Sequence, residues 1–150
     1  MLPRGQDRLH QRNMFAHGWK LTATVVLLQV GSNDLYQLNK SVQEIEQKLI
    51  GLVLALKYCY HVQRVAVLQI LHRQWSRRRI RYQVDIPWFN DRVDTLNTFF
   101  RNYFEEDRVE CVQFWRHSGF WSPENQELVY TNDGVHLNEV YGYTKYYNSV

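Results

Sequence analysis

The chain has 150 residues, of which 45% are hydrophobic and 15% aromatic, and its formal net charge is +3. This composition excludes a disordered polymer and is that of one compact domain. A net charge this small does not by itself indicate a nucleic-acid partner.

The first half of the chain begins with a polar stretch and continues with apolar patterns. Residues 1–20 lack periodicity, so we expect a loose basic leader there and one domain over residues 21–150. Residues 22–30 form a β-branched apolar run, which predicts a strand buried on both faces, as in parallel sheets. Helical spacing of apolar residues predicts a helix over residues 41–57, and Ser41 and Glu44 form a capping-box pattern at its start.

The second half repeats this alternation of strand and helix. The predicted elements are a strand over residues 64–71, a helix from Asp85 and Pro87 to about residue 104, a strand over 109–115 and, after a long loop, a helix over 139–150 with Asn138 as its N-cap. This order predicts an α/β fold, a parallel sheet with helices on both faces. Three strands make a thin sheet where about five are usual, so we expect that the first strands of such a fold have no counterpart among the predicted elements.

Bulk features also indicate where the protein resides. The longest apolar run falls far short of the roughly 20 residues that a bilayer requires, and it lies too deep in the chain for a signal peptide. Cys59 and Cys111 each lie in an apolar run, so we expect two buried, reduced thiols and no disulfide framework. We therefore predict no membrane contact and an intracellular, cytoplasmic location.

Asp133 and His136 follow the third predicted strand, at the edge of the sheet where ligand sites gather. An imidazole can remove a hydroxyl proton at neutral pH, and a nearby carboxylate fixes its tautomer and stabilises the imidazolium. Taken alone, the pair is better explained as a helix-entry Asp and a surface His.

Gly31 and Asn33 follow the first predicted strand. A glycine there permits a tight turn, and an asparagine amide can donate to a developing oxyanion. Taken alone, this pattern also fits an ordinary turn between a strand and a loop.

The two motifs together resemble the SGNH/GDSL superfamily of serine hydrolases (esterases). Residues 26–35, VLLQVGSNDL, are similar to the family's Asn block, and residues 133–138, DGVHLN, are similar to its last block. Residues 66–71 fit the strand between them, although His72 stands where the family often has Pro. The match covers residues 22–150. The sequences of these motifs, with the tail Lys145-Tyr146-Tyr147, are similar to those of SGNH-like domains beside reverse transcriptases in animal retroelements.

The resemblance implies a flavodoxin-like SGNH hydrolase sandwich, represented here by its C-terminal portion. It implies His136 as general base, Asp133 as its orienting carboxylate, and Gly31 and Asn33 as the oxyanion hole. It implies a small ester or acyl substrate, with no cofactor and no metal. The family's nucleophile belongs to a Gly-Asp-Ser block upstream of the Asn block, and this sequence contains no such block. Ser32, Ser118, Cys59 and Cys111 are not placed to replace that serine, and His117 is predicted to be a surface-loop histidine.

The remaining alternatives concern other partners. A basic loop could contact phosphates, but as a single loop in a chain of low net charge it is better explained as solvated; its arginines are Arg73, Arg77, Arg78, Arg79 and Arg81. The exposed edge of the strand over residues 22–30 predicts self-association. Two functions therefore remain open. One is an ester hydrolase domain. The other is a non-catalytic, truncated or binding remnant of that fold, which includes a retroelement-derived module associated with nucleic acid.

Overall fold

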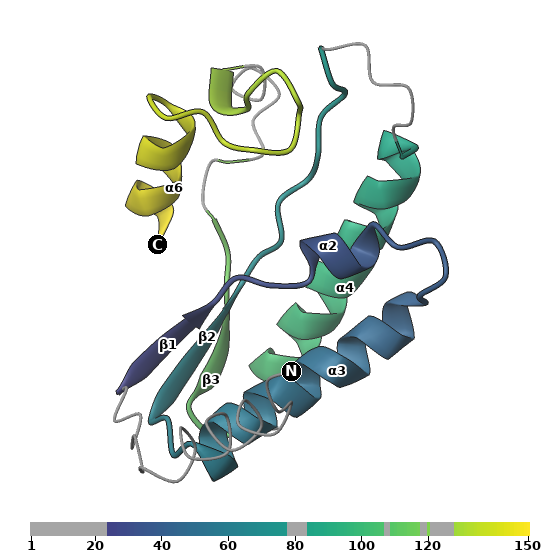
Figure 1. Ribbon diagram of the computed structural model, residues 1–150. Coiled ribbons are helices and arrows are strands. Elements are labelled where there is room, and N and C mark those ends of the chain that lie inside the picture. Colours follow the sequence, from purple (N-terminus) through teal and green to yellow (C-terminus); the bar gives the residue numbers. More distant parts are fainter. Residues whose placement is uncertain (1–23, 78–83, 107–108, 118–119, 121–127) are drawn as a thin grey trace, which may run out of the picture.

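The computed structural model describes residues 24–77, 84–106, 109–117, 120 and 128–150. Strands and helices alternate along the chain, as Figure 1 shows. The elements are β1 (Val25–Leu28), α2 (Ser32–Leu35), α3 (Val42–Leu54), the π-helical segment η1 (Ala55–Cys59), β2 (Arg64–Leu68), α4 (Ile86–Glu105), β3 (Val112–Trp115) and α6 (Gly142–Ser149). The predicted leader, residues 1–20, and Arg78, Arg79, Arg81 and Ser118 lie outside the described residues.

The three strands form one parallel sheet in the order β1-β2-β3, which confirms the predicted α/β fold. α3 and α4 pack on one face of this sheet (Figure 1). α6 lies at the opposite face near the carboxyl ends, where the indole Nε1 of Trp115 donates a hydrogen bond of 2.8 Å to the carbonyl oxygen of Ser149. All three strands point the same way, so the segments that follow them meet at one edge.

Both long helices begin where local sequence signals predict. The backbone amide of Glu44 donates to Ser41 Oγ at 3.2 Å, and the amide of Ser41 donates to Glu44 Oε2 at 2.7 Å, so the capping box is confirmed. Asp85 accepts a hydrogen bond from the amide of Trp88, and Pro87 occupies the first turn of α4. These caps set the start of each helix before packing is considered.

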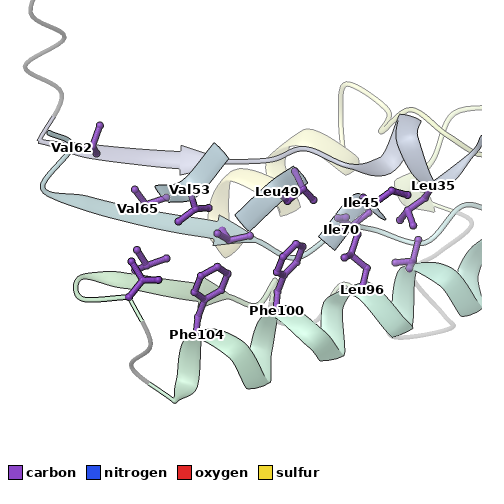
Figure 2. Packing of buried hydrophobic residues seen from close by; sticks show 14 of the residues in the cluster. Leu35, Ile45, Leu49, Val53, Val62, Val65, Ile70, Leu96, Phe100 and Phe104 are labelled. Atoms are coloured by element: carbon purple, nitrogen blue, oxygen red, sulfur yellow. The ribbon is translucent and has the colours of Figure 1, made fainter. Parts of the chain in front are cut away.

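The core lies between the sheet and the two helices. Figure 2 shows Leu49 of α3, Phe100 of α4 and Val65 of β2 turned toward this common interior. Each such side chain contributes roughly 1.5–3 kcal/mol when it is fully buried. Ile70 and Leu96 extend the cluster toward the carboxyl ends of the strands and so support the segments that carry the candidate site.

β1 and α6 differ from the predictions. Val25 and Leu27 are 52% and 54% exposed, so β1 is not buried on both faces. The reason is topological, because β1 is an edge strand and α3 and α4 cover only its other face. α6 begins at Gly142 rather than at residue 139, and Asn138 Oδ1 accepts hydrogen bonds from the amides just before and at its first residue.

Three further predictions on burial are wrong. Cys59 and Cys111 are exposed rather than buried. Cys59 ends η1, and Cys111 stands in the turn before β3 with φ at 59°, so neither points into the core. His117 is only 1% exposed and is not a surface residue.

Among the described helices, none has the length and apolar character needed to cross a bilayer.

Candidate functional site

The Asp133 turn is built around one carboxylate. Its Oδ2 lies 2.7 Å from Nδ1 of His136, and its Oδ1 accepts hydrogen bonds from the backbone amides of Val135 and His136 at 2.8 and 2.9 Å. The hydroxyl of Thr131 donates to the same Oδ1 at 2.7 Å. The three-residue spacing thus lets one turn of backbone hold the carboxylate and present the imidazole beside it.

This network keeps Asp133 ionised. Partial burial by itself would raise the pKa of Asp133, but the hydrogen bonds from His136, Thr131 and the two backbone amides outweigh burial and hold that pKa well below its ordinary value. An ionised carboxylate beside Nδ1 favours the tautomer in which Nδ1 carries the proton. The imidazole is 73% exposed, and its Nε2 has no hydrogen-bond partner in the described part of the chain, so this nitrogen is open to accept a proton.

The turn is docked against the segment that continues β2. The amide of Gln74 donates to the carbonyl oxygen of Gly134 at 2.8 Å, and the amide of Arg77 donates to that of Asn132 at 2.8 Å. Gly134 has a φ of 72°, and a Cβ at this position would overlap the carbonyl oxygen of Gln74. Only glycine therefore allows the turn and the segment after β2 to approach this closely.

Gly31 and Asn33 lie in a second turn, directly after β1. Gly31 has a φ of 106°, and a Cβ there would meet Ile70 Cδ1 at 3.0 Å and Leu49 Cδ1 at 3.2 Å. Leu35 is fully buried and anchors α2 in the core. Asn33 is exposed, and no described residue hydrogen-bonds to its side chain. Its amide is therefore not committed to the fold.

Arg73 connects the two turns. Its Nη2 donates a hydrogen bond of 3.3 Å to Ser32 Oγ, next to Asn33 in α2. Its guanidinium lies between the rings of Phe89 and Tyr36, with ring-centroid distances of 4.3 and 4.9 Å. Figure 1 shows the chain after β2 extending beyond the strand with α2 beside it. The segment after β2 thus contacts both the Asp133 turn and the Gly31–Asn33 turn.

Arg73 is 8% exposed, and its Nε has no hydrogen-bond partner among the described residues. Burial lowers the pKa of Arg73, while Tyr36 and the carboxylate of Asp133 act in the opposite direction. Two hydrogen bonds with Asn90 hold the backbone of Arg73 against α4, one to its amide at 2.9 Å and one to its carbonyl at 3.0 Å. The sequence placed Arg73 only in a basic loop, and its position directly after a strand was the one available signal for a buried role.

In the part of the chain that the structure describes, no candidate nucleophile is bonded to the imidazole of His136. No hydroxyl or thiol of the described residues hydrogen-bonds to His136. Cys59 and Cys111 precede β2 and β3, so they lie at the amino ends of the strands, whereas Asp133 follows β3. The structure brings Asp133 and His136 together. Among the described residues, the segment after β2 connects this pair to the Gly31–Asn33 turn.

His117 is a buried histidine that joins a polar cluster which the sequence analysis missed. Its Nδ1 lies 2.8 Å from Ser149 Oγ, and its Nε2 lies 3.3 Å from Gln29 Oε1, which also accepts the hydroxyl of Tyr146 at 2.9 Å. Burial lowers the pKa of His117 to about 4. The cluster fastens α6 to the carboxyl ends of the outer strands, so the role of the neutral imidazole is structural. Its two-residue spacing from Trp115, which faces the same side, was the signal for its burial.

Comparison with known proteins supports the fold. No protein-family model matches the chain, and no curated protein matches its sequence. A solved structure of a Streptococcus pneumonia protein, provisionally described as a platelet activating factor, is similar with a TM-score of 0.68 and 20% sequence identity. The alignment covers 95% of this chain and 64% of that protein, so this chain spans less than two thirds of the other's length. At this identity the likeness establishes a common α/β fold.

Proposed function

We propose that this chain is the C-terminal portion of an SGNH-type ester hydrolase domain, and that it supplies the general base, its carboxylate and part of the oxyanion hole but neither the nucleophile nor the family's upstream oxyanion donor. His136 is the general base, Asp133 orients it, and Gly31 and Asn33 form the oxyanion side. The observation that carries the proposal is the 2.7 Å pair of Asp133 and His136, with an ionised carboxylate on Nδ1 and an open Nε2. This is the base half of a serine hydrolase.

In the proposed reaction a serine hydroxyl attacks the carbonyl carbon of an ester. Nε2 of His136 takes the hydroxyl proton as the new C–O bond forms, and the carbonyl oxygen becomes an oxyanion. The amide of Asn33 donates to that oxyanion, a contact of the kind that contributes roughly 3–4 kcal/mol in a transition state. The C–O bond to the leaving alcohol then breaks, and His136 returns the proton to the alkoxide. Water repeats the two steps to release the acid and restore the serine.

The decisive experiment begins with the transcript upstream of the Met1 codon. If it continues in frame through an apolar strand into Gly-Asp-Ser, the extended protein should react with a fluorophosphonate and hydrolyse a short activated ester. His136→Ala should abolish both. His61→Asn is the matched control, because His61 is exposed at a φ of 54° that asparagine tolerates, and this variant should leave both unchanged.

The second candidate is a non-catalytic remnant of the same fold, of retroelement origin. It is favoured by the absence of any described hydroxyl or thiol on His136. On this reading, the extended transcript contains no Gly-Asp-Ser block, and the protein hydrolyses esters no faster than His136→Ala does. Saturable turnover by the 150-residue chain that disappears in His136→Ala would contradict both candidates, because it would require a nucleophile within this chain.

A further inference from the structure

A polar cavity of about 150 Å³ lies at the carboxyl ends of β2 and β3, against α4. Gln69 and Arg116, which directly follow these strands, form one wall. Asp94, Thr98 and Arg101 of α4 form the other. None of these residues belongs to the Asp133–His136 pair or to the Gly31–Asn33 turn, so the cavity is distinct from the proposed hydrolase site.

The charges around the cavity are unbalanced. Arg101 and Arg116 both line it, and neither guanidinium has a hydrogen bond or an ion pair within the described chain. Asp94 is the acidic residue among the lining residues, and its Oδ1 lies 2.7 Å from Nε2 of His72. A guanidinium does not lose its proton in proteins, so two arginines and one aspartate give this space a net positive charge that attracts an anion.

The helix α4 is held firmly against β2, and the arginine donors of the cavity come from two elements, α4 and the end of β3. Asn97 accepts from the amide of Ile70 at 2.9 Å and donates to its carbonyl at 2.8 Å, which ties α4 to the end of β2. Thr98 lies three residues before Arg101, so both are on one face of α4. Arg116 approaches from the end of β3. Donors that converge from two sides suit a tetrahedral oxyanion better than a planar carboxylate.

We propose that this cavity binds the dianion of phosphate, as inorganic phosphate or as the terminal monoester of a small molecule, between Arg101 and Arg116. Two guanidinium groups match two negative charges and offer several donors each. A water occupies roughly 30 Å³ of liquid, so the cavity of about 150 Å³ holds a few waters or one tetrahedral oxyanion and is too small to enclose a base or a sugar ring beside it. The proposal does not depend on the hydrolase activity.

Titration calorimetry with inorganic phosphate, at constant ionic strength against chloride, tests this site. The wild-type chain should bind phosphate saturably. Arg101→Gln and Arg116→Gln should each weaken binding by about tenfold or more, as expected for the loss of a charge-assisted hydrogen bond. Arg64→Gln is the matched control, since Arg64 is exposed at the start of β2, and it should bind as the wild type does. His136→Ala should also bind normally, which separates this site from the hydrolase proposal.

Three results would overturn the proposal. The first is the absence of saturable phosphate binding by the wild type. The second is an equal loss in Arg64→Gln, which would indicate a general response to charge. The third comes from a short single-stranded oligonucleotide without a terminal phosphate: if it displaces phosphate at lower concentration than phosphate itself binds, the cavity reads backbone phosphodiesters. Failure of the oligonucleotide to compete supports the monoester site.

Discussion

Nη2 of Arg73 donates a hydrogen bond of 3.3 Å to Oγ of Ser32, and this contact joins the segment after β2 to the turn after β1. The next residue, Gln74, hydrogen-bonds to Gly134 in the Asp133 turn. Two adjacent residues therefore hold the two motifs that are more than ninety positions apart in the sequence. The segment after β2 acts as the common support of the candidate site.

The first prediction concerns the side chain of Arg73. Arg73→Met should change the free energy of unfolding by less than about 1 kcal/mol, because methionine fills the space between Tyr36 and Phe89 and removes a buried charge with an unpartnered Nε. Arg73→Ala leaves a cavity and should cost about 2–3 kcal/mol. Denaturant unfolding measures both.

The same variant separates stability from local order. In Arg73→Met, the amide of Leu35, which donates to the carbonyl of Gly31, should exchange with solvent faster, because the Ser32 contact is lost. Ser32→Ala should have the same effect on this amide. An unfolding free energy that falls equally in Arg73→Met and Arg73→Ala would contradict the prediction, because it would mean that the charge itself stabilises the fold.

The second prediction concerns pH. The pKa of His117 is about 4 in the folded chain and about 6.5 when unfolded, so the unfolded state binds the proton more strongly. The contribution of neutral His117 to the free energy of unfolding should therefore be fully present above pH 6.5 and should be lost as the pH drops from 6.5 to 4. The loss amounts to roughly 3 kcal/mol, at 1.36 kcal/mol for each pKa unit. Thermal unfolding of the wild type across this range provides the measurement.

His117→Gln should flatten this dependence, because glutamine has no titrating group. The Asp133 carboxylate acts in a different window: its pKa is lowered by folding, so its contribution is present above its ordinary value of 3.8 and is lost below it. Asp133→Asn should therefore change the curve only at the acid end. An unaltered slope between pH 4 and 6.5 in His117→Gln would show that another group titrates there.

The third prediction compares two glycines. Gly134→Ala should destabilise the chain by more than about 2 kcal/mol, because alanine is strained at a φ of 72° and its Cβ overlaps the carbonyl of Gln74. Gly51→Ala in α3 is the matched control, since its Cβ meets nothing within 4 Å. This control should stabilise the helix by about 0.5–1 kcal/mol. Equal effects of the two substitutions on the unfolding midpoint would exclude the close approach at Gly134.

The fourth prediction concerns the free edge of the sheet. β1 pairs only with β2 among the described strands, and Leu27 is exposed on the face away from α3 and α4. We expect the chain to self-associate through this edge, and Leu27→Lys to reduce the association, as charged residues do on natural edge strands. Leu38→Lys is the control, because Leu38 is 78% exposed in a loop. Sedimentation that is independent of concentration in the wild type would contradict the prediction.

The sequence by itself determined the α/β order, the helix starts at Ser41 and Asp85, and the Asp133–His136 pair. These features are local: a cap needs a hydrogen bond three residues away, and the pair is closed within one turn of backbone. The alternation of apolar residues likewise requires no knowledge of distant contacts.

Only the tertiary structure decided which polar side chains are buried and which apolar ones are exposed. Arg73 and His117 looked like solvated loop residues, because their places at the ends of strands do not say which distant residues, Phe89 and Ser149, would cover them. Val25 and Leu27 looked buried, since the apolar run does not say whether a helix covers both faces of its strand. Burial depends on partners that are distant in the chain, and those partners are settled only when the elements pack.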